Sequence, residues 1–268
     1  VPEYLIDTNV RIDYGKLRHL LVTGRQLNGN FDLLRDVIGE EQVDTRITPG
    51  FPLAELTEPE NFLSLMHYFG LLSIRGVQGV MPRLAIPNQT VKRLMYGFLR
   101  DAYRDVEVFA VNLFRFEQLM LRMANEGEWR PVFEFLGEAI ARQTGIRDYI
   151  GGEKVVQGFL AAYLSVADYY VFRSEAELGK GHADIALEPL VARYPQLRRG
   201  YLIELKYLKR SEPADAARAA PAADEAAAQL RRYLADERLA RQFPGVRFTG
   251  LVVVFHGWEL TFCDAVRP

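Results

Sequence analysis

Two stretches of the C-terminal third decide the fold: LGKGHADIAL at residues 178–187 and GYLIELKY at residues 200–207. Each reads as a β-strand next to a turn. Because side chains alternate between the two faces of a strand, Glu204 and Lys206 share one face. A carboxylate and an ammonium group are costly to place on an otherwise apolar strand unless they act together or reach solvent. The second stretch is therefore a candidate functional strand.

Asp184 is likewise a charged residue on an otherwise apolar strand, one strand earlier and 20 positions before Glu204 (204 − 184). The residues between them include Pro189, Pro195 and Gly200, which suit a connection that returns an antiparallel strand beside the first. The two carboxylates could then converge. Converging carboxylates are the usual protein contribution to a Mg²⁺ or Mn²⁺ site. Such a cation can activate water and offset charge on a phosphodiester, and a neighbouring lysine can orient that water.

The segments around these strands read as an α/β block. A helix from about residue 148 to 165 precedes β-like segments near residues 169–176, 183–188, 201–207, 247–255 and 258–263. The Ala/Pro-rich stretch at residues 211–223 reads as a loop. Pro221 suits the first turn of a long helix over residues 222–242, which ends before Pro244.

The motifs resemble those of the PD-(D/E)XK nuclease superfamily, and more narrowly of the nuclease-like domain at the C-terminus of bacterial AAA-ATPase-like proteins. The resemblance is carried by GKGHAD at residues 179–184 and YLIELK at residues 201–206. It implies a mixed sheet flanked by helices, with Asp184 and Glu204 as metal ligands and Lys206 assisting the attacking water. It also implies Mg²⁺ or Mn²⁺ as the cofactor and a nucleic acid as the substrate, DNA in preference to RNA.

Further positions agree with the resemblance. Glu153 lies on the helix before the first strand, where many members carry an acidic residue near the metal, so it is a third candidate ligand. Gln229 lies on the helix after the second strand, where a glutamine often accompanies the site, and it shares a helical face with Tyr233. His182 is a departure, because the family usually has a basic residue there.

The N-terminal region reads as mostly helical. Apolar spacing predicts a helix at residues 31–40, and Thr57 followed by Pro59 predicts the start of a second one. Two β-like runs, residues 71–74 and 83–86, predict a hairpin. Helix, helix and hairpin is the order of a winged helix, which we predict for residues 31–88.

Helical periodicity resumes after Asn88, a plausible cap, and continues to about residue 144, with breaks at Gly127 and Pro131. Residues 62–74 and 84–88 are similar to the segment that links the ATPase to the nuclease in the bacterial proteins. The ATPase itself is missing, since no GxxxxGK[ST] motif occurs. The chain also starts at Val1, which suggests a processed product or a piece of a longer protein. The resemblance therefore adds an ATPase module as a candidate partner.

Length and composition narrow the protein class. The 268 residues can form two domains, which we assign as a helical, winged-helix-like region at residues 1–105 and a nuclease-like domain at residues 106–268. The fold class is therefore α+β. With 33 Lys+Arg against 35 Asp+Glu the net charge is −2, so any nucleic-acid contact must be a local basic patch. No apolar run is long enough to span a membrane. The single cysteine, Cys263, favours a reducing cytoplasm.

Less specific interpretations stay open. An E-x-K pattern occurs often by chance, and this strand could be a solvated, salt-bridged edge strand. Glu153 could be an ordinary acid at a helix start, and Gln229 an ordinary surface residue. The alternative function is therefore a non-catalytic module that binds nucleic acid or protein on a nuclease scaffold.

Overall fold

The computed structural model describes residues 17–24, 26–106, 111–142, 153–178, 181–210 and 216–266. The chain divides into two compact units, with the boundary between Val108 and Phe109. Both units combine helices with β-sheet, which confirms the α+β class. Among the described residues, no helix has the length and apolar character needed to cross a lipid bilayer.

The described part of the N-terminal unit is built on a small antiparallel sheet and three longer helices. Its elements are η1 (Arg18–Leu21), β1 (Val22–Thr23), β2 (Gln26–Leu27), α2 (Gly29–Glu40), β3 (Gln42–Asp44), η2 (Leu53–Glu55), α3 (Pro59–Tyr68), β4 (Ser73–Gln78), β5 (Met81–Ala85) and α4 (Gln89–Asp105). The sheet has the order β3-β5-β4. Helix α2 packs against α3 and α4.

The hairpin predicted in this unit is confirmed as β4 and β5. Gly76 lies inside β4 at a register shift, and the turn contains Gly79 with a φ of +63°. The strand β3 was missed because its sequence, Gln-Val-Asp, is too short to show alternation. The winged-helix interpretation of residues 31–88 stays a prediction.

The helix starts were predicted with mixed success. The Asn88 side chain accepts a hydrogen bond from the Val91 N–H (3.0 Å), which confirms it as the cap of α4. Thr57 was wrong as a cap, because Glu58 occupies that position and Pro59 is the first helical residue. The proline ring already fixes the backbone angle needed there, so the helix starts without a side-chain cap.

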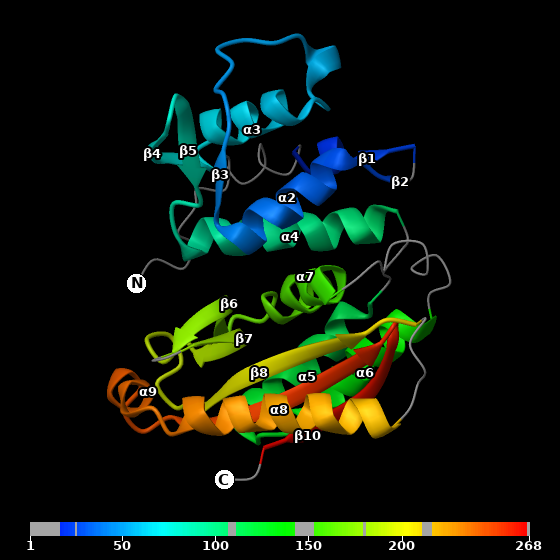
Figure 1. Ribbon diagram of the computed structural model, residues 1–268, viewed down its shortest axis with the longest axis vertical. Helices are drawn as coiled ribbons and strands as arrows, with labels where there is room; N and C mark the ends of the chain where they lie inside the picture. Colours follow the sequence, from blue (N-terminus) through cyan, green and yellow to red (C-terminus); the bar gives the residue numbers. More distant parts are fainter. Residues whose placement is uncertain are drawn as a thin grey trace. The chain divides into compact units, whose positions relative to one another are not determined.

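The C-terminal unit contains a five-stranded mixed sheet with the order β10-β9-β8-β7-β6 (Figure 1). Its elements are α5 (Leu113–Asn125), α6 (Arg130–Arg142), α7 (Glu153–Leu164), β6 (Tyr170–Leu178), β7 (Gly181–Pro189), β8 (Arg199–Leu208), α8 (Ala216–Leu234), α9 (Glu237–Gln242), β9 (Arg247–His256) and β10 (Glu259–Ala265). Strands β8 and β9 run parallel, and the other neighbours are antiparallel. A mixed sheet flanked by helices is therefore confirmed.

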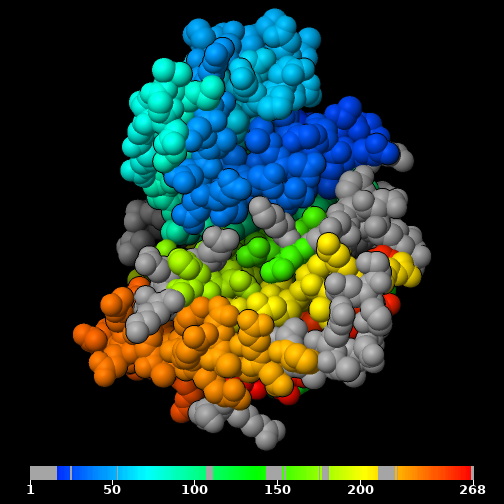
Figure 2. Space-filling model, viewed as in Figure 1, coloured from blue at the N-terminus to red at the C-terminus, as the bar shows by residue number. Residues whose placement is uncertain are grey.

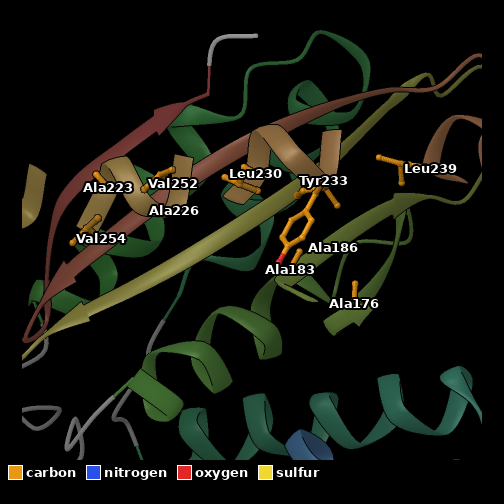
Figure 3. Close-up of a cluster of buried hydrophobic side chains, with 11 residues drawn as sticks. Ala176, Ala183, Ala186, Ala223, Ala226, Leu230, Tyr233, Leu239, Val252 and Val254 are labelled. Atoms are coloured by element: carbon orange, nitrogen blue, oxygen red, sulfur yellow. The ribbon is translucent and has the colours of Figure 1, made fainter. Parts of the chain in front are cut away.

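Helices cover both faces of this sheet. Ala226 and Leu230 of α8 belong to a buried apolar cluster (Figure 3). Leu202 of β8 is part of the same cluster. The next residue back, Tyr201, points the other way, and its hydroxyl donates to the Met123 carbonyl of α5 (2.8 Å). On the face seen in Figure 2, α8 and α9, in orange, lie at the surface of this unit. The alternation predicted for residues 201–202 is thus confirmed.

Several helix boundaries in this unit differ from the predictions. The helix expected at residues 222–242 is two helices, because the Asp236 side chain accepts from the Arg238 N–H (2.9 Å) and caps α9. Helix α8 begins at Ala216, so Pro221 lies inside it and residues 216–223 are not a loop. The many alanines favour helix strongly enough to include a proline near its start. Residues 211–215 lie outside the described chain.

The helical stretch predicted from Asn88 onward also has a different pattern. Helix α4 ends at Asp105 and α5 begins at Leu113, a break that was not predicted. The predicted break at Gly127 is confirmed, because α5 ends at Asn125 and α6 begins at Arg130. Pro131 lies in the first turn of α6, where a proline loses no internal hydrogen bond. The helix predicted from residue 148 is described from Glu153 onward.

Candidate active site

The site lies where strands β7 and β8 separate. Their antiparallel ladder joins residues 185–187 to residues 201–203, whereas β8 stays paired with β9 along its whole length. Strand β7 pairs with β6 from Gly181 to Pro189. Asp184 and Glu204 are the first residues beyond the ladder on their strands. They therefore stand at the opening between β7 and the second half of β8.

Asp184 is held by the backbone of the neighbouring strand. Its Oδ2 accepts a hydrogen bond from the Leu205 N–H at 2.7 Å. A hydrogen bond from a backbone N–H to a carboxylate is charge-assisted and stronger than one between neutral groups. The carboxylate of Asp184 is thereby fixed next to Glu204, as the predicted return of an antiparallel strand requires.

Glu204 is buried, with 1% of its side chain exposed. Its Oε2 lies 3.6 Å from the Lys206 Nζ, and its Oε1 has no hydrogen-bond partner among the described residues. Burial, and after it the negative charge of Asp184, raises the pKa of Glu204 to about 8, while Lys206 acts in the opposite direction. The structure thus brings the two acids and the amine predicted from the sequence together.

Glu153 is the first residue of α7 and is exposed. Loss of surrounding water raises the pKa of Glu153, the charge of Asp184 raises it further, and Lys206 lowers it. Glu153 is therefore within electrostatic reach of the same group. One helical turn later, the Gln157 Nε2 approaches the Asp184 carbonyl at 3.5 Å. Gln157 was not predicted, although its spacing of four from Glu153 places both residues on one helix face.

Gln229 contacts the start of β7 rather than a carboxylate. Its Nε2 donates to the Tyr233 hydroxyl at 2.7 Å and approaches the His182 carbonyl at 3.4 Å. The Tyr233 hydroxyl in turn donates to the His182 carbonyl at 3.0 Å. Figure 3 shows the Tyr233 ring pointing from α8 toward Ala183. Gln229 and Tyr233 together hold the backbone at His182, two residues before Asp184. The contact between Tyr233 and His182 was not predicted.

Gly181 makes room for this tyrosine, because a Cβ at Gly181 would lie 2.4 Å from the Tyr233 hydroxyl. Replacing Gly181 by Ala is expected to cost about 1–3 kcal/mol of unfolding free energy, the usual range for overpacking. Urea unfolding measures it. Tyr233→Phe in the same chain should recover part of the loss, because the atom closest to the new methyl group is removed.

The matched control is Gly39→Ala on α2, where a Cβ meets no atom within 4 Å. It should leave stability unchanged or slightly raised, because alanine favours helix over glycine. Equal effects of Gly181→Ala in the Tyr233 and Phe backgrounds would contradict the close contact.

The two carboxylates of the site fit part of the ligand requirement of a divalent cation. Asp184 and Glu204 offer adjacent oxygen ligands, which Mg²⁺ and Mn²⁺ prefer, and the buried Oε1 of Glu204 lacks a partner among the described residues. A buried carboxylate oxygen without a partner is costly unless something binds it. Within the described chain, however, no three His, Cys, Asp or Glu side chains form a complete ligand group.

Comparison with known proteins bears on the same region. Residues 151–265 match the family model of the PD-(D/E)XK nuclease superfamily. The chain matched none of the curated proteins and none of the solved structures with which it was compared. The matched segment includes all the residues predicted for the site, namely Glu153, Asp184, Glu204, Lys206 and Gln229. Residues 151–265, in the C-terminal part of the chain, are therefore similar to a PD-(D/E)XK nuclease-superfamily domain.

Proposed function

We propose that this domain is a nuclease that depends on Mg²⁺ or Mn²⁺ and hydrolyses phosphodiester bonds in nucleic acid, DNA in preference to RNA. The observation that supports it most is the buried Oε1 of Glu204, which has no hydrogen-bond partner among the described residues and stands beside the Asp184 carboxylate. The similarity to the PD-(D/E)XK nuclease superfamily supports the same reaction class.

Asp184 and Glu204 would hold the cation, with Glu153 as a third carboxylate from α7. The Oδ2 of Asp184 is engaged by the Leu205 N–H, which leaves Oδ1 for a cation. A bound cation would lower the pKa of a water molecule and neutralise charge on the phosphodiester. Glu204 would be a ligand in its ionised form, so a cation would compete with the proton that burial favours.

Lys206 would act on the attacking water and on the reacting phosphate. Its side chain is 30% exposed, so the ammonium group can reach both Glu204 and solvent. An ammonium at that position can orient the attacking water and stabilise negative charge as it develops on the phosphate. Gln229 would act through Tyr233 and the backbone at His182, which makes it a positioning residue in this proposal.

The ATPase partner rests on the resemblance of the N-terminal region and stays a prediction. A net charge of −2 also gives the protein no overall attraction for a polyanion. Contact with nucleic acid would therefore depend on local basic groups, Lys206 among them. Binding should consequently weaken steeply as salt concentration rises.

Calorimetric titration with Mn²⁺ tests the metal site directly. The wild-type domain is expected to bind Mn²⁺ with a measurable heat at pH 8, and Asp184→Asn is expected to lower the affinity at least about tenfold, because one charged ligand is lost. Asp168→Asn is the matched control, since Asp168 is a surface acid of the same unit that pairs with Arg193. Its affinity should equal that of the wild type.

Incubation of the wild-type protein with Mn²⁺ and labelled single- and double-stranded substrates tests the reaction. Release of shortened products supports the proposal. If Mn²⁺ binds and every substrate stays intact, the hydrolytic assignment fails and the non-catalytic alternative is left. If neither binding nor cleavage occurs, the metal assignment fails as well.

A further inference from the structure

A second polar site lies at the other end of β8. A pocket of about 380 Å³ opens at the first residues of β8 and β9. Its polar lining comes from Asn125, Gln196, Arg198, Arg199 and Arg247. Arg199 and Glu204 are separated by five positions on one strand, which corresponds to about 17 Å between their Cα atoms. The pocket is therefore distinct from the acidic site.

The pocket gathers three positive charges. Arg199 and Arg247 are register partners in the parallel ladder, and the Arg247 N–H donates to the Arg198 carbonyl (2.8 Å). Like charges directly opposite each other on neighbouring strands destabilise a sheet. Among the ion pairs formed within the described chain, none includes these three arginines. The local positive charge is thus not neutralised by described carboxylates.

Two of the guanidinium groups are held in place by neutral backbone carbonyls. Arg198 Nη1 donates to the carbonyls of Pro195 and Leu197, the latter at 2.9 Å. Arg199 Nε donates to the Asn125 carbonyl at 3.4 Å. Such bonds orient a guanidinium without cancelling its charge, and each group has five N–H donors, so others are left for a ligand.

Gly127 contributes to the position of Arg199. A Cβ at Gly127 would lie 2.9 Å from the Arg199 Nη1, and its φ of +84° also favours glycine. A cation at the C-terminal end of α5 is favourable in itself, because the last carbonyls of a helix carry partial negative charge. The charge at the end of α5 accounts for the position of Arg199. It does not account for Arg198 and Arg247, which line the same pocket.

We propose that this pocket binds a small ligand that carries two or more linked phosphate groups and is recognised through those phosphates. Guanidinium groups match phosphate oxygens with paired hydrogen bonds, and the volume lies within the range of small-molecule sites. The lining includes no aromatic side chain from the described residues on which a base could stack. The charges converge on one cavity, whereas contacts to a polynucleotide backbone are spread along a line.

Calorimetric titration with pyrophosphate, without divalent cation, is the test. The wild-type protein should bind pyrophosphate more tightly than inorganic phosphate, because two phosphates can engage more guanidinium donors. The double variant Arg198→Gln/Arg247→Gln should lose at least tenfold in affinity. Arg142→Gln is the matched control: Arg142 pairs with Glu138 on α6 and does not line the pocket, so its affinity should stay unchanged.

A second variant keeps the test decisive if the double arginine variant does not fold. Gln196 is exposed and lines the pocket, so Gln196→Glu adds a carboxylate among the arginines without removing any packing. It should raise the melting temperature of the free protein and weaken pyrophosphate binding at least tenfold. Retention of wild-type affinity by Gln196→Glu would overturn the proposal.

The remaining outcomes also decide the question. No heat with millimolar pyrophosphate overturns the proposal. Tight binding of a single-stranded oligonucleotide that depends on Arg198 and Arg247, with no binding of pyrophosphate, overturns it in favour of a substrate contact. Asp184→Asn should leave pyrophosphate binding intact, so this result does not depend on whether the acidic site is a nuclease.

Discussion

Replacing Lys206 by Met is expected to lower the single-turnover rate of phosphodiester cleavage in Mn²⁺ by about 10²- to 10³-fold, the usual effect of removing one group that stabilises developing negative charge. Met retains most of the apolar length of the side chain, so the fold should be preserved. The rate is measured with saturating enzyme and a labelled substrate, which separates the chemical step from product release.

Lys209→Met is the matched control, because Lys209 is the first residue after β8, is exposed and has no assigned role at the site. Its rate should stay within about twofold of the wild type once salt is held constant. Lys206 also lowers the pKa of Glu204, so Mn²⁺ affinity is measured in parallel. A rate loss that vanishes at saturating Mn²⁺ would assign Lys206 to metal binding instead of the chemical step.

The second large effect concerns Glu204 and the stability of the metal-free protein. Burial raises the pKa of Glu204 from 4.5 to about 8 in the folded state. The folded protein therefore keeps a proton that the unfolded chain releases. This stabilisation is fully present below about pH 4.5 and is lost as pH rises through about 8. The expected loss is at most about 1.4 kcal/mol per pH unit within that window.

Glu204→Gln should remove this pH dependence, because the amide does not ionise. Urea unfolding at several pH values between 5 and 8 compares the variant with the wild type, and Glu237→Gln, a change at an exposed acid, is the control. At the upper end of the window Glu204→Gln should be the most stable of the three proteins. A variant that is less stable than the wild type at pH 8 contradicts the unfavourable burial of this charge.

Much of the site could be predicted from local patterns. Alternation along a strand placed Glu204 and Lys206 together, and the short connection before Gly200 predicted an antiparallel return. The patterns could not supply the length of the β7–β8 ladder, because that depends on where β7, which stays paired with β6 from Gly181 to Pro189, separates from β8. The separation of the strands at Asp184 therefore appears in the structure alone.

The contacts that were missed join segments distant in the sequence. The closeness of Gly181 to Tyr233 depends on how α8 packs on the sheet. The pairing of Arg199 with Arg247 depends on a parallel ladder formed after a helical crossover. Neither follows from the periodicity of one element. The break between α8 and α9 could have been found, because Asp236 followed by Glu237 is a common helix start.

Asp184 also completes the backbone hydrogen bonding of β8, because its carboxylate accepts from the Leu205 N–H at a point where β7 no longer pairs with β8. Truncation to alanine would expose an unsatisfied amide in the middle of the sheet as well as delete a ligand. Loss of turnover in such a protein could then reflect a distorted strand. Asparagine keeps an oxygen at the same place, so it separates the electrostatic contribution of Asp184 from its architectural one.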